Sequence, residues 1–368
     1  MEAPREHVPA GKKALLISGG APNATLMAGA LVAFIDQGVE FDVVSTSGAG
    51  ALIGLLYQAP VGGDPRKALS QTVNMGISDL IYRALPINYK VFMKPGTGAE
   101  LYRKLLAMNP FARELQEQLG DNQAERLLND WLQLWWQTLS PSNLGPQSLG
   151  LCAHVPFAST VIDFAAIKQV KPYFYINAFN VSKGQMEIWT KEELSLDHFL
   201  AALSFPLIYP PYQIGEDYYI EGAAIDTINF RALVSDNPAE PGLHTDLDTL
   251  VVFDILGSDK LIQKPRDLYD AWVRSIITPL VEISRDDIKL FEYQYNLNPD
   301  GTPKRRLLKV PLMADIPADH WPKVLDWSSS NLELLYKVGY NAGLKFCHEH
   351  ADALNIEFNG RIPPMQLS

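Results

Sequence analysis

The first 60 residues alternate short apolar runs with segments of helical periodicity. Residues 13–18 form an unbroken apolar run that ends at two glycines, which is typical of a strand buried on both faces of a parallel sheet. Apolar side chains recur at helical spacing over 24–37, a second strand is expected at 41–44, and an apolar helix at 51–57. Strand, helix, strand and helix in this order predict an α/β fold.

The pattern changes over 62–156, where prolines interrupt segments of helical periodicity. This texture predicts a helical insertion or cap within a single domain that spans 1–368. Trp131, Trp135 and Trp136 lie on adjoining helical turns of the insertion. A packed seam between helices explains them, and a lid or a lipid-facing surface is the alternative, because amphipathic aromatic side chains also favour interfaces.

Strand-like segments return after the insertion. Apolar runs at 173–180, 250–255 and 307–310 predict three further strands. The segment 205–211 is rich in proline and predicts a turn, and 331–346 predicts a closing helix. The second half of the chain therefore continues the α/β pattern of the first 60 residues.

The composition is that of a globular chain, and it limits the partners. Of 368 residues, 47% are apolar and 20% are charged, with a formal net charge of −11. An acidic chain without a basic tail is not suited to neutralising phosphates, which argues against nucleic acid as a partner. No stretch reaches the roughly 20 apolar residues of a membrane span, so we expect at most peripheral membrane contact. The early apolar run is broken by glycine and proline and does not read as a signal peptide.

The two cysteines carry a prediction about the compartment. Cys152 and Cys347 lie far apart in the sequence, in apolar surroundings. They are expected to be reduced core thiols of a cytoplasmic protein, with a single disulfide as the alternative.

Two turns rich in glycine and serine follow the first two strands. The turn at 18–23 exposes backbone N–H groups beside the positive end of a helix, which suits an anion or a developing oxyanion. The dinucleotide-binding pattern G-x-G-x-x-G is absent. Ser47 separates the second strand from its helix, with Ser45 and Ala49 two residues to either side, so the nucleophile pattern G-x-S-x-G appears as S-x-S-x-A. Taken alone, Ser47 would be explained as a helix N-cap.

These segments resemble the patatin-like phospholipases. Residues 17–31 are similar to the family's glycine-rich oxyanion loop and first helix, and 44–52 to its nucleophile elbow, which places Ser47 at the catalytic serine. Three further segments follow the family's order and spacing: 175–178, 202–211 and 219–223. The resemblance covers 13–57 and 172–230. It implies a three-layer α/β/α fold with a mainly parallel central sheet, and ester hydrolysis by a serine and a carboxylate without histidine.

The resemblance also assigns roles to individual residues. Ser47 is expected to attack the ester carbonyl. Glu221, at the place of the family's catalytic aspartate, would accept the serine proton and later activate water. No cofactor and no metal are implied. The expected substrate is an acyl ester, and the resemblance favours a lipid or lysolipid. Four residues are expected to hold the oxyanion: Gly19, Gly20, Ala21 and Asn23.

Several positions depart from the family's pattern, and alternatives follow from them. The third glycine of the oxyanion loop is Ala21, both elbow glycines are replaced, and Glu221 has one methylene more than aspartate. An extra methylene moves a carboxylate by about 1 Å, and a misplacement of that size can cost about a hundredfold in rate. Three interpretations stay open: an active dyad with adjusted geometry, Asp226 as a substitute carboxylate, and a protein without catalysis that binds or scaffolds acyl lipids.

Histidines offer a further alternative, a triad that uses a residue downstream of Glu221. None of the four candidates has a motif that marks it out, and we expect them in exposed or loop positions. His348 and His350 are separated by one residue, with no third ligand class nearby, so no metal site is predicted. The four candidates are His244, His320, His348 and His350.

Overall fold

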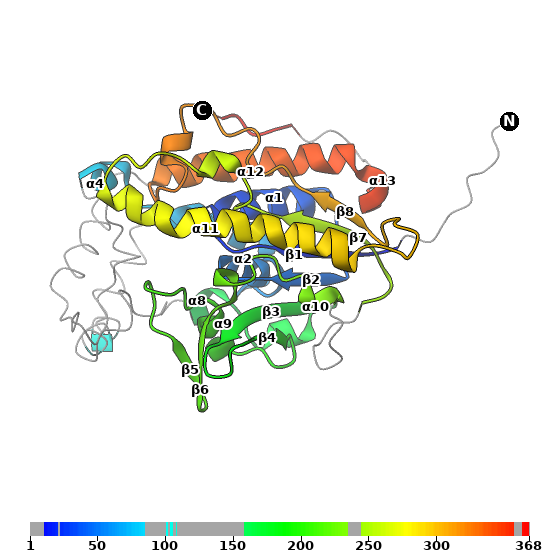
Figure 1. Cartoon of the computed structure of the whole chain (residues 1–368). Helices are drawn as coiled ribbons and strands as arrows, with labels where there is room; N and C mark the ends of the chain where they lie inside the picture. The colour runs from blue at the N-terminus through cyan, green and yellow to red at the C-terminus, as the bar shows by residue number, and fades with distance from the viewer. Residues whose placement is uncertain are drawn as a thin grey trace.

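The computed structural model of the chain describes residues 11–20, 23–84, 101, 104–105, 108, 158–234, 244–356 and 363–367. These residues form a sheet flanked by helices (Figure 1). The strands are β1 (Lys12–Ile17), β2 (Val43–Thr46), β3 (Tyr173–Asn180), β4 (Gln185–Thr190), β5 (Tyr212–Ile214), β6 (Asp217–Glu221), β7 (Leu247–Phe253) and β8 (Arg306–Lys309). The helices are α1 (Ala24–Asp36), α2 (Ala49–Gln58), α3 (Pro65–Ser70), α4 (Asp79–Ala84), α8 (Ala158–Val161), α9 (Leu196–Ala202), α10 (Arg231–Val234), α11 (Leu268–Leu290), α12 (Ser329–Glu349) and α13 (Ala351–Leu354).

The sheet is parallel at its centre and antiparallel at one end. The strand order is β5-β6-β3-β2-β1-β7-β8, and β4 pairs with β3 beside this path. β1 runs parallel to both of its neighbours, as do the pairs β2 with β3 and β7 with β8. Helical crossovers such as α1 between β1 and β2 produce this parallel arrangement. The predicted α/β class with a mainly parallel central sheet is confirmed.

Both faces of the central strands are buried. Leu15 and Ile17 of β1 pack in the large apolar cluster that includes α1 and α12. Ala14 and Leu16 point to the opposite face, into a second cluster with α10 and the last residues of α11. This double burial explains why the strand reads as an unbroken apolar run rather than an alternating one. The helices on both faces give the three-layer α/β/α architecture that the sequence predicted.

The first and last long helices, α1 and α12, cross closely because both carry a glycine at the contact. A Cβ atom added to Gly29 would overlap the carbonyl oxygen of Tyr336, and one added to Gly339 would overlap that of Leu26. Figure 1 shows α12 lying along α1 on the same side of the sheet. The end of the chain therefore completes the layer that the first crossover helix begins.

The described first part of the predicted insertion, residues 62–84, packs against the core. Within 62–84, α3 contacts α1 and α2, and Leu69 is fully buried in the main cluster. This described stretch therefore packs on the sheet's helical layer. Trp131, Trp135 and Trp136 lie outside the described residues, as does Cys152, and Cys347 is a buried free thiol.

Several elements of the fold were not predicted from the sequence. The helix α11 was not predicted, although apolar side chains at Val273, Ile276, Ile277 and Leu280 follow helical spacing and Asp267 caps its first turn by accepting from the N–H of Asp270 at 2.8 Å. Pro279 inside the helix obscures the pattern. The short strands β4 and β5 were also missed.

Of the helices in the described ranges, none combines the length and the apolar character of a membrane-crossing segment.

Candidate active site

The polar turns of the sequence meet at one edge of the sheet. β1, β2 and β3 run in register, with Ile17 opposite Thr46 and Thr46 opposite Ile176. The segments that follow β1 and β2 therefore leave the sheet side by side, at its carboxyl edge. β6 reaches the same region, because Glu221 at its end pairs with Ala178 of β3. Ligands of open α/β sheets bind outside this edge.

The hydroxyl of Ser47 is turned into the protein. Ser47 is fully buried, and its Oγ donates to the carbonyl oxygen of Asp226 at 2.9 Å. The backbone N–H of Ser47 donates to the carbonyl of Ile17 at 3.1 Å, which continues the β1–β2 ladder. Within the described ranges no hydrogen bond joins Ser47 to Glu221, so the two members of the predicted dyad are near in the fold without being engaged. The nucleophilic role of Ser47 stays a prediction.

The tip of the turn is the next residue, Gly48. Its backbone has φ 51° and ψ −128°, and it is the N-cap of α2. A nucleophile elbow holds its serine in a strained conformation at the turn from strand to helix, and here that conformation belongs to a glycine. Counted from Gly48, the pattern is Thr46-Ser47-Gly48-Ala49-Gly50, which keeps the small residues and the final glycine of G-x-S-x-G. The backbone therefore places Gly48, one residue after Ser47, where an elbow presents its nucleophile.

Glu221 faces Gly48. A Cβ atom added to Gly48 would overlap the Oε1 atom of Glu221 and would lie 2.8 Å from the Cβ of Ala223. The same carboxylate oxygen is 3.6 Å from the position of a Cβ on Gly19. The Glu221 carboxyl thus fills the space that a side chain at the tip of the turn would need. Burial raises the pKa of Glu221 from its ordinary value of 4.5 to about 8.

Asp226, the substitute carboxylate considered from the sequence, is oriented differently. Its carboxylate lies 3.5 Å from Nε of Arg231, while its backbone carbonyl accepts the Ser47 hydroxyl and, at 3.4 Å, the side-chain amide of Asn177. The contact of Asp226 with Ser47 is therefore made by the main chain, not by the carboxylate.

The predicted oxyanion residues divide into three cases. The N–H of Gly19 donates to the carbonyl of Thr227 at 3.3 Å, and Gly20 turns the chain with φ 124°. Ala21 lies outside the described residues. Asn23 is 1% exposed, and neither its amide nitrogen nor its amide oxygen has a hydrogen-bond partner. Since buried amides are ordinarily paired, the side chain of Asn23 has unused hydrogen-bonding capacity at the start of α1.

Two of the downstream histidines are engaged away from the elbow. The ring of His244 shares a hydrogen bond of 2.9 Å with the hydroxyl of Tyr175, and Nε2 of His320 lies 2.6 Å from the side-chain oxygen of Asn331. The ring of His350 packs on Phe346. Over the part of the chain that the structure describes, no three His, Cys, Asp or Glu side chains gather as a metal site.

A residue that sequence reasoning missed supports the loop after β6. One carboxylate oxygen of Asp287, on α11, accepts from the N–H and the hydroxyl of Thr227 at 2.8 and 2.7 Å, and from the N–H of Ile228 at 3.1 Å. Burial, the largest cause, raises the pKa of Asp287 to about 6. The helix α11 thereby fixes the loop whose carbonyl at Asp226 holds Ser47.

Comparison with known proteins identifies the family. The model for patatin-like phospholipase matches residues 15–234, which is more than half of the chain. Among solved structures, the chain is similar to VipD from Legionella pneumophila, with a TM-score of 0.39 and 11% sequence identity, over 93% of this chain and 67% of that chain. Among curated proteins, none matches this chain. The extent of the family match shows that the chain belongs to the patatin-like phospholipase family.

Proposed function

We propose that this protein binds an acyl lipid at the patatin-type site without cleaving it by serine chemistry. The observation that carries the proposal is the glycine at the tip of the elbow. Gly48 has no side chain to attack a carbonyl carbon, and the carboxyl of Glu221 lies where such a side chain would stand. Covalent catalysis by this family's type of site needs a hydroxyl there with a base beside it.

Binding of an acyl lipid is supported by the side chain of Asn23. The side chain of Asn23 is buried and unpartnered at the beginning of α1, a helix of 13 residues. Its amide can donate to the carbonyl oxygen of an ester. The positive end of the α1 helix dipole also favours this oxygen, because it is the negative end of the carbonyl dipole. An acyl lipid is the ligand that membership of a phospholipase family favours.

Hydrolysis by Ser47 and Glu221 is the competing proposal. The raised pKa of Glu221, about 8, would make its carboxylate a stronger base than an ordinary glutamate. For this mechanism the Ser47 hydroxyl must release the carbonyl of Asp226, 2.9 Å away, and turn toward both the carboxylate and a substrate. The proposed dyad thus requires a rearrangement of the Ser47 hydroxyl.

Labelling with a fluorophosphonate probe separates the two proposals. We expect no labelling of the wild-type chain and none of Ser47→Ala. The double variant Gly48→Ser with Glu221→Asp is labelled in parallel, because it places a hydroxyl at the tip and shortens the acid that fills this space, and labelling of this variant would indicate that the missing hydroxyl explains the inert wild type. Wild-type labelling or ester turnover that disappears in Ser47→Ala would establish the dyad and overturn the binding-only proposal.

Lipid binding is tested with Asn23→Leu. A fluorescent lysophospholipid is titrated into both proteins, and we expect roughly tenfold weaker binding by the variant, the usual scale for one lost hydrogen bond of about 1.4 kcal/mol. Since the Asn23 amide has no partner in the protein, the substitution removes no internal hydrogen bond and should leave the melting temperature undiminished. Equal lipid affinity of the two proteins, or no binding by either, contradicts the proposal.

A further inference from the structure

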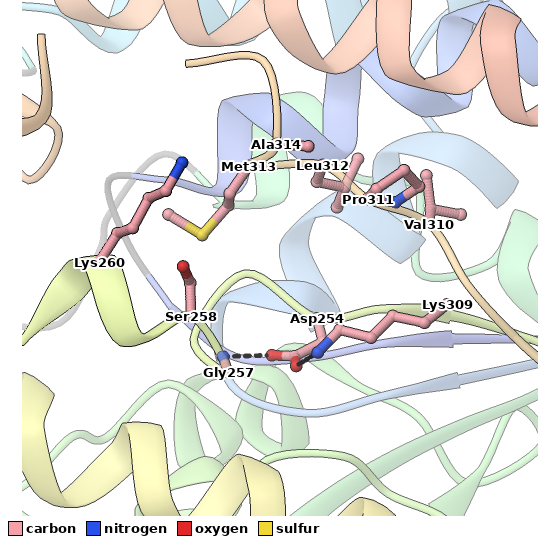
Figure 2. Close-up of a pocket in the computed structure, with 10 residues that line it drawn as sticks. All are labelled: Asp254, Gly257, Ser258, Lys260, Lys309, Val310, Pro311, Leu312, Met313 and Ala314. Atoms are coloured by element: carbon pink, nitrogen blue, oxygen red, sulfur yellow. Dashed lines mark hydrogen bonds and ion pairs between the residues drawn. The ribbon is translucent and has the colours of Figure 1, made fainter. Parts of the chain in front are cut away.

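A cavity opens at the carboxyl ends of β7 and β8 (Figure 2). It has a volume of about 230 Å³ and lies between the loop after β7 and the segment 309–314. The loop also borders the turn after β1, because the N–H of Ile255 donates to Oγ of Ser18 at 3.4 Å. The cavity therefore occupies the same ligand-binding edge of the sheet as the elbow, two strands further along.

Asp254 forms the floor of the cavity, and its acceptor capacity is taken up within the protein. One carboxylate oxygen accepts from the N–H groups of Leu256 and Gly257, at 3.0 and 2.7 Å, and from the hydroxyl of Ser284 at 2.8 Å. The other oxygen accepts from Nζ of Lys309 at 2.5 Å. The buried carboxylate thus holds Lys309 in place and is not placed to recruit a cation.

Lys260 provides a second ammonium group from the opposite side. Figure 2 shows Lys260 and Lys309 at opposite ends of the lining, with Ser258 between them. Nζ of Lys260 lies 5.1 Å above the ring of Trp321, which restrains it. The neighbouring Asp259 is not in the lining; it pairs with Arg285, which also pairs with Glu282.

The lining combines this charge with an apolar wall. Two lysines against one aspartate give the cavity a formal charge of +1 in a chain whose net charge is −11. Leu312 and Met313, both buried, close the other side. A cation-lined pocket in an acidic chain selects a ligand with a concentrated negative charge, and ammonium groups bind phosphate oxygens with charge-assisted hydrogen bonds.

We propose that this cavity binds a phosphate monoester, with the phosphate between Lys260 and Lys309 and the organic part against Leu312 and Met313. The phosphate can belong to a soluble ester or to a lipid headgroup. The proposal does not rest on the function proposed above, because neither an acyl chain nor a nucleophile enters it.

Calorimetric titration of the full chain with glycerol 3-phosphate tests the site. Lys260→Gln removes a pocket charge, and Lys264→Gln is the matched control, since Lys264 is exposed on the same segment and is not in the lining. At fixed ionic strength we expect saturable 1:1 binding by the wild type and the control, and about tenfold weaker binding by Lys260→Gln, the scale of one charge-assisted hydrogen bond. Lys309 is left unchanged because its removal would leave the buried Asp254 carboxylate without its paired positive charge.

The absence of saturable binding overturns the proposal, and so do equal affinities of Lys260→Gln and Lys264→Gln, which would indicate a general charge effect. A short-chain lysophosphatidate distinguishes the two sources of phosphate. Tighter binding than that of glycerol 3-phosphate supports the site with a lipid headgroup as ligand, and equal binding supports it with a soluble ester. Because Asn23 is not in the lining, Asn23→Leu should bind glycerol 3-phosphate normally, which keeps this result separate from the lipid test at the elbow.

Discussion

Replacing Glu221 by glutamine should change how stability depends on pH. Glutamine keeps the length and shape of the side chain but does not titrate. Below pH 4.5, Glu221 is neutral in the folded and the unfolded chain alike. As the pH rises, the unfolded chain releases the proton near 4.5 whereas the folded chain retains it until about 8. The unfolded state is therefore favoured progressively across this interval, and the wild type loses stability that Glu221→Gln retains.

The size of the effect follows from the two pKa values. Their separation, from 4.5 to about 8, corresponds to about 5 kcal/mol at about 1.4 kcal/mol for each pH unit. The penalty applies nearly in full because Glu221 is buried. Above about pH 8 the difference levels off, because both states are then ionised. Other titrating groups are common to the two proteins and cancel in the comparison.

Urea unfolding at several pH values measures this difference. We expect the free energy of unfolding of Glu221→Gln to exceed that of the wild type by an amount that grows by about 5 kcal/mol between about pH 4 and pH 9. Glu216→Gln is the control for the same substitution at the surface, since Glu216 is exposed in the turn between β5 and β6. A Glu221→Gln difference that does not change with pH would refute the buried, neutral carboxyl at the elbow.

Three further substitutions test the packing around the site. Gly339→Ala should lower stability by about 3 kcal/mol or more in urea unfolding, because its Cβ meets the backbone of Leu26, which cannot move aside as a side chain would. Asp287→Ala leaves three donors of the loop after β6 without an acceptor. It should lower the free energy of unfolding by about 3 kcal/mol and speed hydrogen exchange in that loop. Ser47→Ala removes only the hydrogen bond to the Asp226 carbonyl and should cost about 1 kcal/mol, measured by thermal unfolding, without altering lipid affinity.

The α/β core was predictable because each central strand is buried on both faces. Strands buried on both faces have unbroken apolar runs in the sequence, as at 14–17, and glycines in the following turns mark where the runs end. The helix α11 was not predicted because Pro279 lies within it and because two buried charged residues, Asp270 and Arg274, interrupt its apolar stripe. The role of Asp287 was not predicted either, because no pattern in the neighbouring sequence marks a carboxylate that binds a loop far away in the chain.

The site was predictable as a region but not atom by atom. The strand-to-helix turn and the acid at the end of β6 were both identified, and the fold brings them to one edge. Which residue stands at the tip depends on the backbone: Gly48 takes the positive φ, a choice that a serine-centred pattern does not reveal. Gly50 was the available signal, because counting back from it as the final glycine of G-x-S-x-G leads to Gly48 rather than Ser47.

Gly48 and Glu221 are best understood as one coupled departure from the family's pattern. With glycine at the tip, the extra methylene of glutamate carries a carboxyl into the volume that a nucleophile would occupy. A serine restored alone at Gly48 would place its Cβ against the Glu221 carboxyl, which is the movable end of a flexible side chain, and 2.8 Å from the Cβ of Ala223. Aspartate restored alone would leave the tip without a hydroxyl. The two substitutions are therefore coupled, and the labelling experiment tests them together in the double variant.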